Sequence, residues 1–207
     1  NFRFGRGRTG NCDFLLEEGK ARDWSIDILP PVKVGQESVS STLIRQKVSM
    51  GETGKAEPLL GHPFFLSGVV VKGDQRGRSL GFPTANLAVS PEKLVPMRGV
   101  YAAASLVEGK WEASALNIGF NPTFSGIRAL RVEAHLIGFE GDLYGKTLTV
   151  LLLDHLRGEL QFPSVQDLVI RMHEDISEAD SIWRDYASSH GPMLDRLSNS
   201  LERAKGD

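Results

Sequence analysis

The chain has 207 residues, of which 41% are hydrophobic and 24% charged, as is ordinary for one full globular domain and part of another. Its formal net charge of −2 argues against a basic surface for nucleic acid or for an anionic membrane. Cys12 is the only cysteine, which excludes an internal disulfide, and no apolar run approaches the ~18 residues of a membrane span. We therefore expect a cytoplasmic protein.

The opening part of the chain has the character of a fragment. It starts with Asn-Phe-Arg-Phe-Gly, which has neither an initiator Met nor a signal peptide, so we expect it to begin inside a longer protein. A short helix or strand is expected at 13–16 and a short strand at 32–34. The hydroxyl residues 40–42 predict the cap of a helix over 43–50, because they accept hydrogen bonds from the open N–H groups of a first turn. The polar segment 51–58 is expected to be a linker.

From residue 64 onward, short apolar runs alternate with glycine-containing turns. A Glu-Gly pair at 108–109 marks a hairpin. Several strands at this spacing predict a closed antiparallel barrel or a sandwich. The expected strands cover residues 64–71, 99–106, 113–118, 131–137 and 147–153.

After Pro163 the spacing of apolar residues becomes helical. Ser164 and Asp167 resemble a capping box in which Asp replaces the usual Glu. Gly191-Pro192 is expected to end this helix, and a second, shorter helix is expected over 193–204. The apolar residues that share one face of the first helix are Val165, Leu168, Val169, Met172, Ile176, Ala179 and Trp183.

A loop before the second expected strand combines three glycines with two arginines. Gly73, Gly77 and Gly81 let the backbone approach a ligand closely, and Arg76 and Arg78 can neutralise phosphate oxygens. Exposed N–H groups in such a loop form an anion-binding site, although the Gly-Lys-Ser/Thr end of a Walker A loop is missing. The alternative is a long, solvated basic turn.

Two places carry polar side chains that suit phosphate transfer. Thr84 and Asn86 are two residues apart, so on a strand both point to one face, and their oxygens suit Mg²⁺ that is held mostly by phosphates and waters. The alternative is a turn that these side chains stabilise. Glu133 alternates with Val132 and Ala134, so it either faces solvent or lines a pocket where it accepts a proton from a hydroxyl.

Arg131 and His135 share the face of Glu133 on the expected strand. The segment 117–124 mixes amides with two aromatic residues, so it either lines a flat aromatic ligand or forms a tight turn. No histidine has metal-site spacing, and a structural or solvated role is assigned to each of His62, His135, His155, His173 and His190.

Taken together, these segments resemble the riboflavin kinase family. Each segment alone is weakly specific, but the set occurs in the order of the family. The resemblance implies a mainly β fold, a six-stranded antiparallel, Greek-key-like barrel with C-terminal helices. The matching segments are Gly-Arg-Ser-Leu-Gly-Phe-Pro-Thr-Ala-Asn-Leu (77–87), Arg-Gly-Val-Tyr-Ala (98–102), Asn-Ile-Gly-Phe-Asn-Pro-Thr-Phe (117–124), Val-Glu-Ala-His-Leu (132–136), Asp-Leu-Tyr-Gly (142–145) and Leu-Arg-Gly-Glu-Leu-Gln-Phe (156–162).

The resemblance also implies a reaction, transfer of the γ-phosphate of ATP to riboflavin to give FMN and ADP, without a nucleic-acid or membrane partner. It implies that Glu133 is the base acting on the ribityl 5′-hydroxyl and that Thr84 and Asn86 bind Mg²⁺. The implied ATP-binding residues are Gly73, Arg76, Gly77, Arg78, Gly81, Thr84 and Asn86, in part as a flap over ATP. The implied flavin-binding residues are Asn117, Arg157, Glu159 and Phe162.

Residues 1–56 resemble the C-terminal end of the FMN adenylyltransferase half of bacterial bifunctional riboflavin kinase/FAD synthetase. The matches lie at 1–5 and 40–45, while the family's upstream His-x-Gly-His-type motif is missing. The resemblance implies a remnant of an α/β Rossmann-like nucleotidyltransferase domain at 1–56 and a kinase domain at 57–207. The full-length protein is expected to adenylylate FMN to FAD, and this chain to make FMN but no FAD.

Two other classes of protein are alternatives to a kinase. A flavin-binding carrier without turnover needs the flavin pocket but neither Thr84 and Asn86 nor a basic loop. A small barrel that binds nucleic acid needs a basic face with exposed aromatic residues, which the net charge of −2 disfavours.

Overall fold

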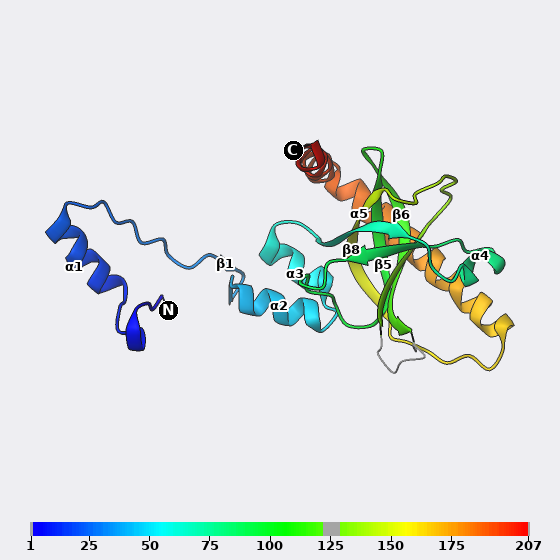
Figure 1. Ribbon diagram of the computed structural model, residues 1–207, viewed down its shortest axis with the longest axis horizontal. Coiled ribbons are helices and arrows are strands. Elements are labelled where there is room, and N and C mark those ends of the chain that lie inside the picture. Colours follow the sequence, from blue (N-terminus) through cyan, green and yellow to red (C-terminus); the bar gives the residue numbers. More distant parts are fainter. Residues whose placement is uncertain (1, 122–128, 207) are drawn as a thin grey trace. The chain divides into compact units, whose positions relative to one another are not determined.

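A computed structural model describes residues 2–121 and 129–206. They belong to two compact units, Asn1–Val39 and Ser40–Asp207. In the larger unit, six antiparallel strands form a closed barrel, which confirms the expected barrel and not the sandwich (Figure 1). The end of the motif 117–124 falls outside the described residues.

The strands of the barrel do not follow one another in sequence order. Around the barrel the order is β3-β4-β7-β6-β5-β8, and β8 pairs with β3 to close it. The five-residue strand β4 was not among the strands expected from the sequence. The strands are β3 (Phe64–Val71), β4 (Ala85–Val89), β5 (Gly99–Val107), β6 (Lys110–Asn121), β7 (Ala129–Leu136) and β8 (Thr147–Arg157).

The barrel interior is filled by side chains that alternate along each strand, as expected for a barrel of this size. On β7, Val132, Ala134 and Leu136 are buried in the interior cluster, which confirms the predicted alternation with Glu133. Tyr101 on β5 is fully buried, and its hydroxyl donates to the Met97 carbonyl. Burial raises the pKa of Tyr101 to about 12, so the phenol stays a neutral donor.

One long helix, α5 (Val165–Gly206), covers part of the outer face of the barrel. Its Ser164 cap is confirmed, because the Asp167 N–H donates to Ser164 Oγ at 3.1 Å, and the Ser164 hydroxyl donates to Asp167 Oδ2 at 2.6 Å. The expected break at Gly191-Pro192 is wrong, since all 42 residues are helical. Packing holds the helix together beyond the proline: Leu194 is buried against the barrel, and Trp111 Nε1 donates to its carbonyl at 3.2 Å.

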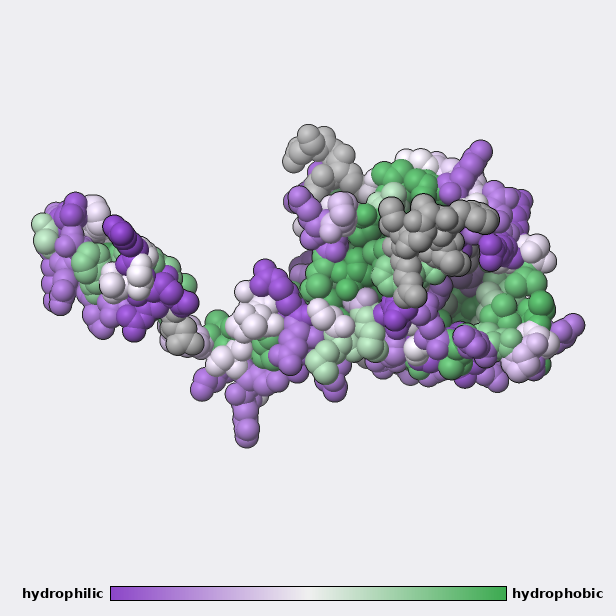
Figure 2. Space-filling model, turned by 60° about the horizontal axis from the view of Figure 1, so that its bottom comes forward, coloured by the Kyte–Doolittle hydropathy of each residue, from purple (hydrophilic) through white to green (hydrophobic). Residues whose placement is uncertain are grey.

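Small side chains on the barrel allow this close packing. Ala102 and Ala104 on β5 and Ala115 on β6 form an outer cluster with Ala179 of α5. β5 is therefore buried at every position, because one face lines the barrel and the other lies under α5. Figure 2 shows hydrophobic residues among hydrophilic ones on one face of the larger unit. No helix in the described part of the chain is both long and apolar enough to cross a membrane.

The segment 51–58 is not a linker. It contributes to α3 (Thr53–Leu60), which follows α2 (Ser41–Ser49) and packs on β3 and β8. Ala56 is fully buried in the barrel's core cluster. The compact unit thus begins at Ser40, which caps α2 through its Oγ at 3.2 Å from the Leu43 nitrogen.

Helix α3 also contacts α5 by one polar pair. The Tyr186 hydroxyl donates to Glu57 Oε1, and burial together with this carboxylate raises the pKa of Tyr186 above its usual range. The boundary of the two proposed domains at 56–57 stays a prediction, because a compact unit and an inherited domain need not share their limits.

The smaller unit contains η1 (Arg6–Arg8), α1 (Cys12–Arg22) and the strand pair β1 (Lys33–Val34) and β2 (Glu37–Ser38). Asn11 caps α1 through Oδ1, 2.9 Å from the Phe14 nitrogen. The described residues of this unit show no Rossmann-like sheet, so the nucleotidyltransferase remnant stays a prediction.

Replacing Gly191 tests the continuity of α5. Gly191 has no positive φ, and an added Cβ would meet nothing within 4 Å outside its chain neighbours and the adjacent backbone of the helix. Gly191→Ala should therefore raise the free energy of unfolding by about 0.5–1 kcal/mol, measured by urea denaturation. Gly61→Ala is the matched control, since that site is equally open but has φ 78° and should lose stability. A loss of stability in both variants would contradict the continuous helix.

Candidate active site

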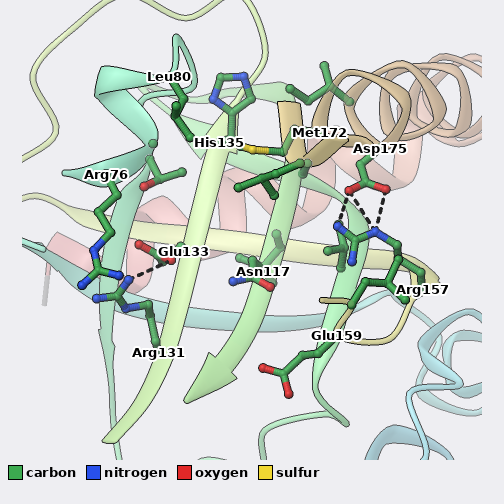
Figure 3. A pocket seen from close by; sticks show the side chains of 18 of the residues that line it. Arg76, Leu80, Asn117, Arg131, Glu133, His135, Arg157, Glu159, Met172 and Asp175 are labelled. Carbon is green, nitrogen blue, oxygen red and sulfur yellow. Dashed lines mark hydrogen bonds and ion pairs between the residues drawn. The ribbon is translucent and has the colours of Figure 1, made fainter. Parts of the chain in front are cut away.

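A cavity of about 460 Å³ lies between the outer face of the barrel and the first part of α5 (Figure 3). Polar and charged side chains come mainly from the strands, and apolar ones mainly from α5 and from the loop before it. The lining residues are Arg76, Gly77, Leu80, Thr84, Val100, Ala115, Leu116, Asn117, Arg131, Glu133, His135, Arg157, Glu159, Leu160, Phe162, Leu168, Met172, Asp175 and Ile176.

Strand register aligns five of the site positions in one row. Asn86 on β4 pairs with Glu133 on β7, and Glu133 pairs with Asn117 on β6. Asn117 pairs with Val100 on β5, and Val100 pairs with Arg157 on β8. Directly paired residues project from the same face of a sheet. Four predicted site residues from distant parts of the sequence therefore lie in one line across the outer face.

The position of Arg157 depends on a bulge in β8. His155 pairs with Tyr101, but Arg157 pairs with Val100, so the register skips one residue between them. His155 is the cross-strand partner of Tyr101, whose side chain points into the barrel. Without the skip, Arg157 would lie on the same face as His155 and would also point into the barrel. Gly99 lies beside this bulge at φ 149°, and a Cβ there would be 2.3 Å from the Arg157 carbonyl oxygen. The bulge and the glycine together turn Arg157 toward the cavity.

A buried carboxylate holds Arg157 in place. Asp175 on α5 accepts from Arg157 Nε at 3.0 Å and from Arg157 Nη2 at 2.7 Å, and its side chain is 5% exposed. A second guanidinium approaches the same carboxylate, since Arg171 Nε lies 2.9 Å from Asp175 Oδ1. The Arg157 guanidinium also lies 5.8 Å from the centre of the Phe162 ring. Arg157 is thus fixed on both sides before any ligand binds.

Glu133 lies at the other end of the cavity, so it is not the exposed strand charge that remained as an alternative. Its side chain is 16% exposed, and Oε2 is 3.4 Å from Arg131 Nη1. Figure 3 shows the Glu133 carboxylate beside the guanidinium groups of Arg76 and Arg131, while Arg157 and Asp175 lie across the cavity. The cavity therefore has two charged ends joined by the polar row.

Thr84 lies where two cavities meet. It lines the cavity of Glu133 and also a second cavity of about 300 Å³, whose lining includes Arg78, Phe139 and Tyr144. Among the predicted ATP-binding residues, Arg76, Gly77 and Thr84 line the first cavity and Arg78 the second. Neither lining includes Gly73, Gly81 or Asn86.

Asn86 is nevertheless adjacent to the site, as the partner of Glu133 in the row. Its carboxamide packs on the backbone of Gly73, where an added Cβ would be 2.3 Å from Asn86 Nδ2. The glycine-rich loop is therefore in contact with the row through this side chain. All four predicted flavin-binding residues, Asn117, Arg157, Glu159 and Phe162, line the first cavity.

Sequence reasoning did not single out several residues that line the cavity. His135, assigned a structural or solvated role, lines it and makes a 2.8 Å hydrogen bond between Nδ1 and the Pro83 carbonyl. Strand alternation already placed Arg131 and His135 on the face of Glu133. The sequence also indicated that Asp175 lies at the barrel side of the helix, because Asp175 shares one helix face with the apolar residues Met172 and Ile176.

The glutamate of the predicted flavin loop is held by an ion pair at the cavity rim. Arg98 Nη1 donates to Glu159 Oε2 at 3.0 Å, and both side chains are about half exposed. The Arg98 guanidinium lies 5.5 Å from the centre of the Phe120 ring. This chain of contacts attaches the loop after β8 to the end of β6.

Comparison with known proteins agrees with this arrangement. A family model described as "Flavokinase: Riboflavin kinase" matches residues 60–183, more than half of the chain. The chain belongs to the riboflavin kinase family. The family match thus covers the whole barrel and the part of α5 that lines the cavity.

Curated relatives are longer than this family member. The bifunctional riboflavin kinase/FMN adenylyltransferase of Escherichia coli K12 is 40% identical over 178 residues, covering 84% of this chain and 56% of that protein. The protein of the same name from Listeria monocytogenes is 33% identical over 175 residues, covering 84% and 55%. The chain therefore spans a little more than half the length of these relatives.

A solved structure shares the fold of this riboflavin kinase family member. It is titled "Crystal Structure of Macrolide-efflux Protein from Streptococcus pneumoniae", with a TM-score of 0.78 and 33% identity. The match covers 87% of this chain and 58% of that one. The similarity supports the arrangement of the elements described above.

Removing the charge of Asp175 tests how Arg157 is held. Asp175→Asn keeps the shape but breaks a buried ion pair, so the free energy of unfolding should fall by about 3 kcal/mol. Riboflavin affinity, measured by flavin fluorescence, should fall as well, because Arg157 loses its support. Asp180→Asn is the matched control, since its pair with Arg184 lies on the exposed side of the same helix. Equal stability of the two variants would contradict this account.

Proposed function

We propose that this domain transfers the γ-phosphate of ATP to the ribityl 5′-hydroxyl of riboflavin, giving FMN and ADP. The observation that carries the proposal is the polar row, which runs from Glu133 beside Arg76 and Arg131 to Arg157 and faces an apolar wall of the same cavity. Membership of the riboflavin kinase family supports the same reaction.

The apolar wall of the cavity suits a flat heterocycle. Phe162 and Leu160 from the loop, together with Leu168, Met172 and Ile176 from α5, supply an apolar wall. Asn117 and Arg157 supply polar groups at its edge, which is the usual composition of a site for a small organic molecule. An isoalloxazine ring bound here directs its ribityl chain along the row toward Glu133.

The second cavity suits the nucleoside of ATP. Phe139, Leu143 and Tyr144 give it an apolar wall, and Arg78 contributes a positive charge. Because Thr84 lines both cavities, a nucleotide in the second brings its terminal phosphate to the first. The two substrates then meet beside Glu133.

Thr84 and Asn86 fit the binding of Mg²⁺. A hydroxyl and a carboxamide oxygen are hard, neutral donors, which suit an ion held mainly by phosphates and waters. The close contact of Asn86 with the Gly73 backbone fixes the carboxamide next to the row. When bound, the ion neutralises charge on the transferred phosphoryl group.

The protein's own side chains supply positioning and proton acceptance. A primary alcohol must be held in line with the γ-phosphate, and this orientation contributes much of the rate. Asn117 lies beside Glu133 in the row and can orient the ribityl hydroxyls. Glu133 accepts the proton of the 5′-hydroxyl late in the reaction, so its position matters more than its basicity.

The arrangement favours turnover over simple flavin carriage. A carrier has no use for a second cavity that shares Thr84 with the first, nor for arginines from a glycine-rich loop at that junction.

For the longer protein we propose the second activity named in its relatives, adenylylation of FMN, with residues 1–56 as part of that domain. We also propose a cytoplasmic location.

Replacing Glu133 tests the proposed base. Glu133→Gln keeps the hydrogen-bonding reach but cannot accept the proton, so kcat for FMN formation should fall by roughly 10²-fold or more with riboflavin affinity nearly kept. Steady-state kinetics with chromatography of FMN measures this. Glu178→Gln, on the exposed side of α5 and outside both cavities, is the control and should retain kcat. Full kcat in Glu133→Gln with loss in Asp142→Asn would reassign the base.

Replacing the neutral oxygen donors tests the metal site. Thr84→Ala and Asn86→Ala should each lower the rate of FMN formation strongly and raise the Mg²⁺ concentration needed for half-maximal rate. A magnesium titration of the initial rate measures both effects. Thr147→Ala, at an exposed strand start outside both cavities, is the control and should match the unmodified protein. Normal rates at low Mg²⁺ in the Thr84 and Asn86 variants would refute the site.

A further inference from the structure

A carboxylate from the glycine-rich loop lies on the two arginines at the Glu133 end of the cavity. Asp74 Oδ2 is 2.7 Å from Arg131 Nη2 and 3.6 Å from Arg76 Nη2. Both arginines line the cavity. Two guanidinium groups thus converge on a single oxygen atom, in the geometry that binds an anion with several oxygens.

The two arginines differ in how they are held. Arg131 projects from β7, two residues before Glu133, and its side chain is 19% exposed. Arg76 projects from the short helix α4 (Arg76–Ser79) in the loop, and its side chain is 84% exposed. Arg131 is therefore the fixed member of the pair, placed by the barrel itself, and a guanidinium so largely removed from water needs an anionic partner.

We propose that Arg131 is a further catalytic residue, which binds the terminal phosphate of ATP after that phosphate displaces Asp74. This inference rests on the proposed kinase function. A phosphate offers more charge and more acceptor oxygens than a carboxylate, and the guanidinium fork binds two of them at once. The fork pairs with Asp74 through Nη2 and with Glu133 through Nη1, so a phosphate in place of Asp74 lies next to the proposed base.

Asp74 acts in this scheme as a substitute anion. Without nucleotide, the carboxylates of Asp74 and Glu133 balance the charges of Arg76 and Arg131. ATP has to displace Asp74 from Arg131, which lowers its apparent affinity. The exchange also frees the loop that carries Asp74 to rearrange around the phosphates, because the pair that attaches it to β7 is broken.

Nucleotide binding and turnover, measured separately, test this role. Isothermal titration with the magnesium complex of the β,γ-imido analogue of ATP should show a Kd raised roughly 10- to 100-fold in Arg131→Gln. Arg131→Lys should give an intermediate Kd, since it keeps the charge but loses the fork. FMN formation should fall in both variants, while riboflavin affinity by fluorescence stays unchanged and shows that the fold is intact.

Substitution of Asp74 gives a second, independent test, because it changes nucleotide affinity in the opposite direction. Asp74→Asn should tighten binding of the analogue roughly two- to fivefold, the size expected for removing one partly exposed ion pair. In the Arg131→Gln background the same substitution should no longer tighten binding. Arg184→Gln, whose side chain is 75% exposed on α5, is the matched control and should leave nucleotide affinity and turnover unchanged.

Two results would overturn the inference. Unchanged nucleotide affinity and normal FMN formation in Arg131→Gln would refute the role of Arg131 and leave the kinase function standing. Weaker binding in Asp74→Asn, equal to that in Arg131→Gln, would mean that the ion pair only supports the loop. Absence of FMN formation in the unmodified protein would instead refute the proposed function itself, whatever the affinities.

Discussion

Closure of the barrel fixes the register between its strands, and every other feature of the site depends on that register. Five residues from five strands meet in one row only because no strand can shift along its neighbour. They are Asn86, Glu133, Asn117, Val100 and Arg157. A slip of one residue would turn a strand's side chains to its other face. The interior packing that prevents such slips is therefore also what aligns the polar groups.

The row becomes a cavity because α5 lies against the outer face of the same barrel. Ala102, Ala104 and Ala115 let the helix approach closely, and its first part then forms the apolar wall opposite the strands. Asp175 connects the two layers through its pair with Arg157. Packing and electrostatics thus act at one place, where a buried carboxylate from the helix fixes a guanidinium from the barrel.

Charge is distributed so that each end of the cavity is balanced before a ligand binds. Asp175 faces Arg157 and Arg171 at one end, while Asp74 and Glu133 face Arg131 and Arg76 at the other. The first set is largely buried and rigid, whereas the second includes a loop carboxylate that is 44% exposed. An anionic substrate can exchange with the second set at much lower cost, because less desolvated charge has to be separated.

The sequence alone determined most of the strands, the caps of α2 and α5 and the face of Glu133, because these follow from local periodicity and side-chain chemistry. Periodicity left a barrel and a sandwich open, and the resemblance to riboflavin kinases selected the barrel. The predictions from sequence were wrong where tertiary packing overrides local preference. Helix α3 forms in a polar segment because Ala56 is buried against the barrel. Helix α5 continues through Pro192 because Leu194 is packed beyond it. Only the tertiary structure decided that the face of Glu133 lines a cavity together with Asp175 of α5 and that a bulge turns Arg157 toward this cavity. Those contacts join residues far apart in the chain, and strand register and helix docking, which set them, are not encoded in any one segment.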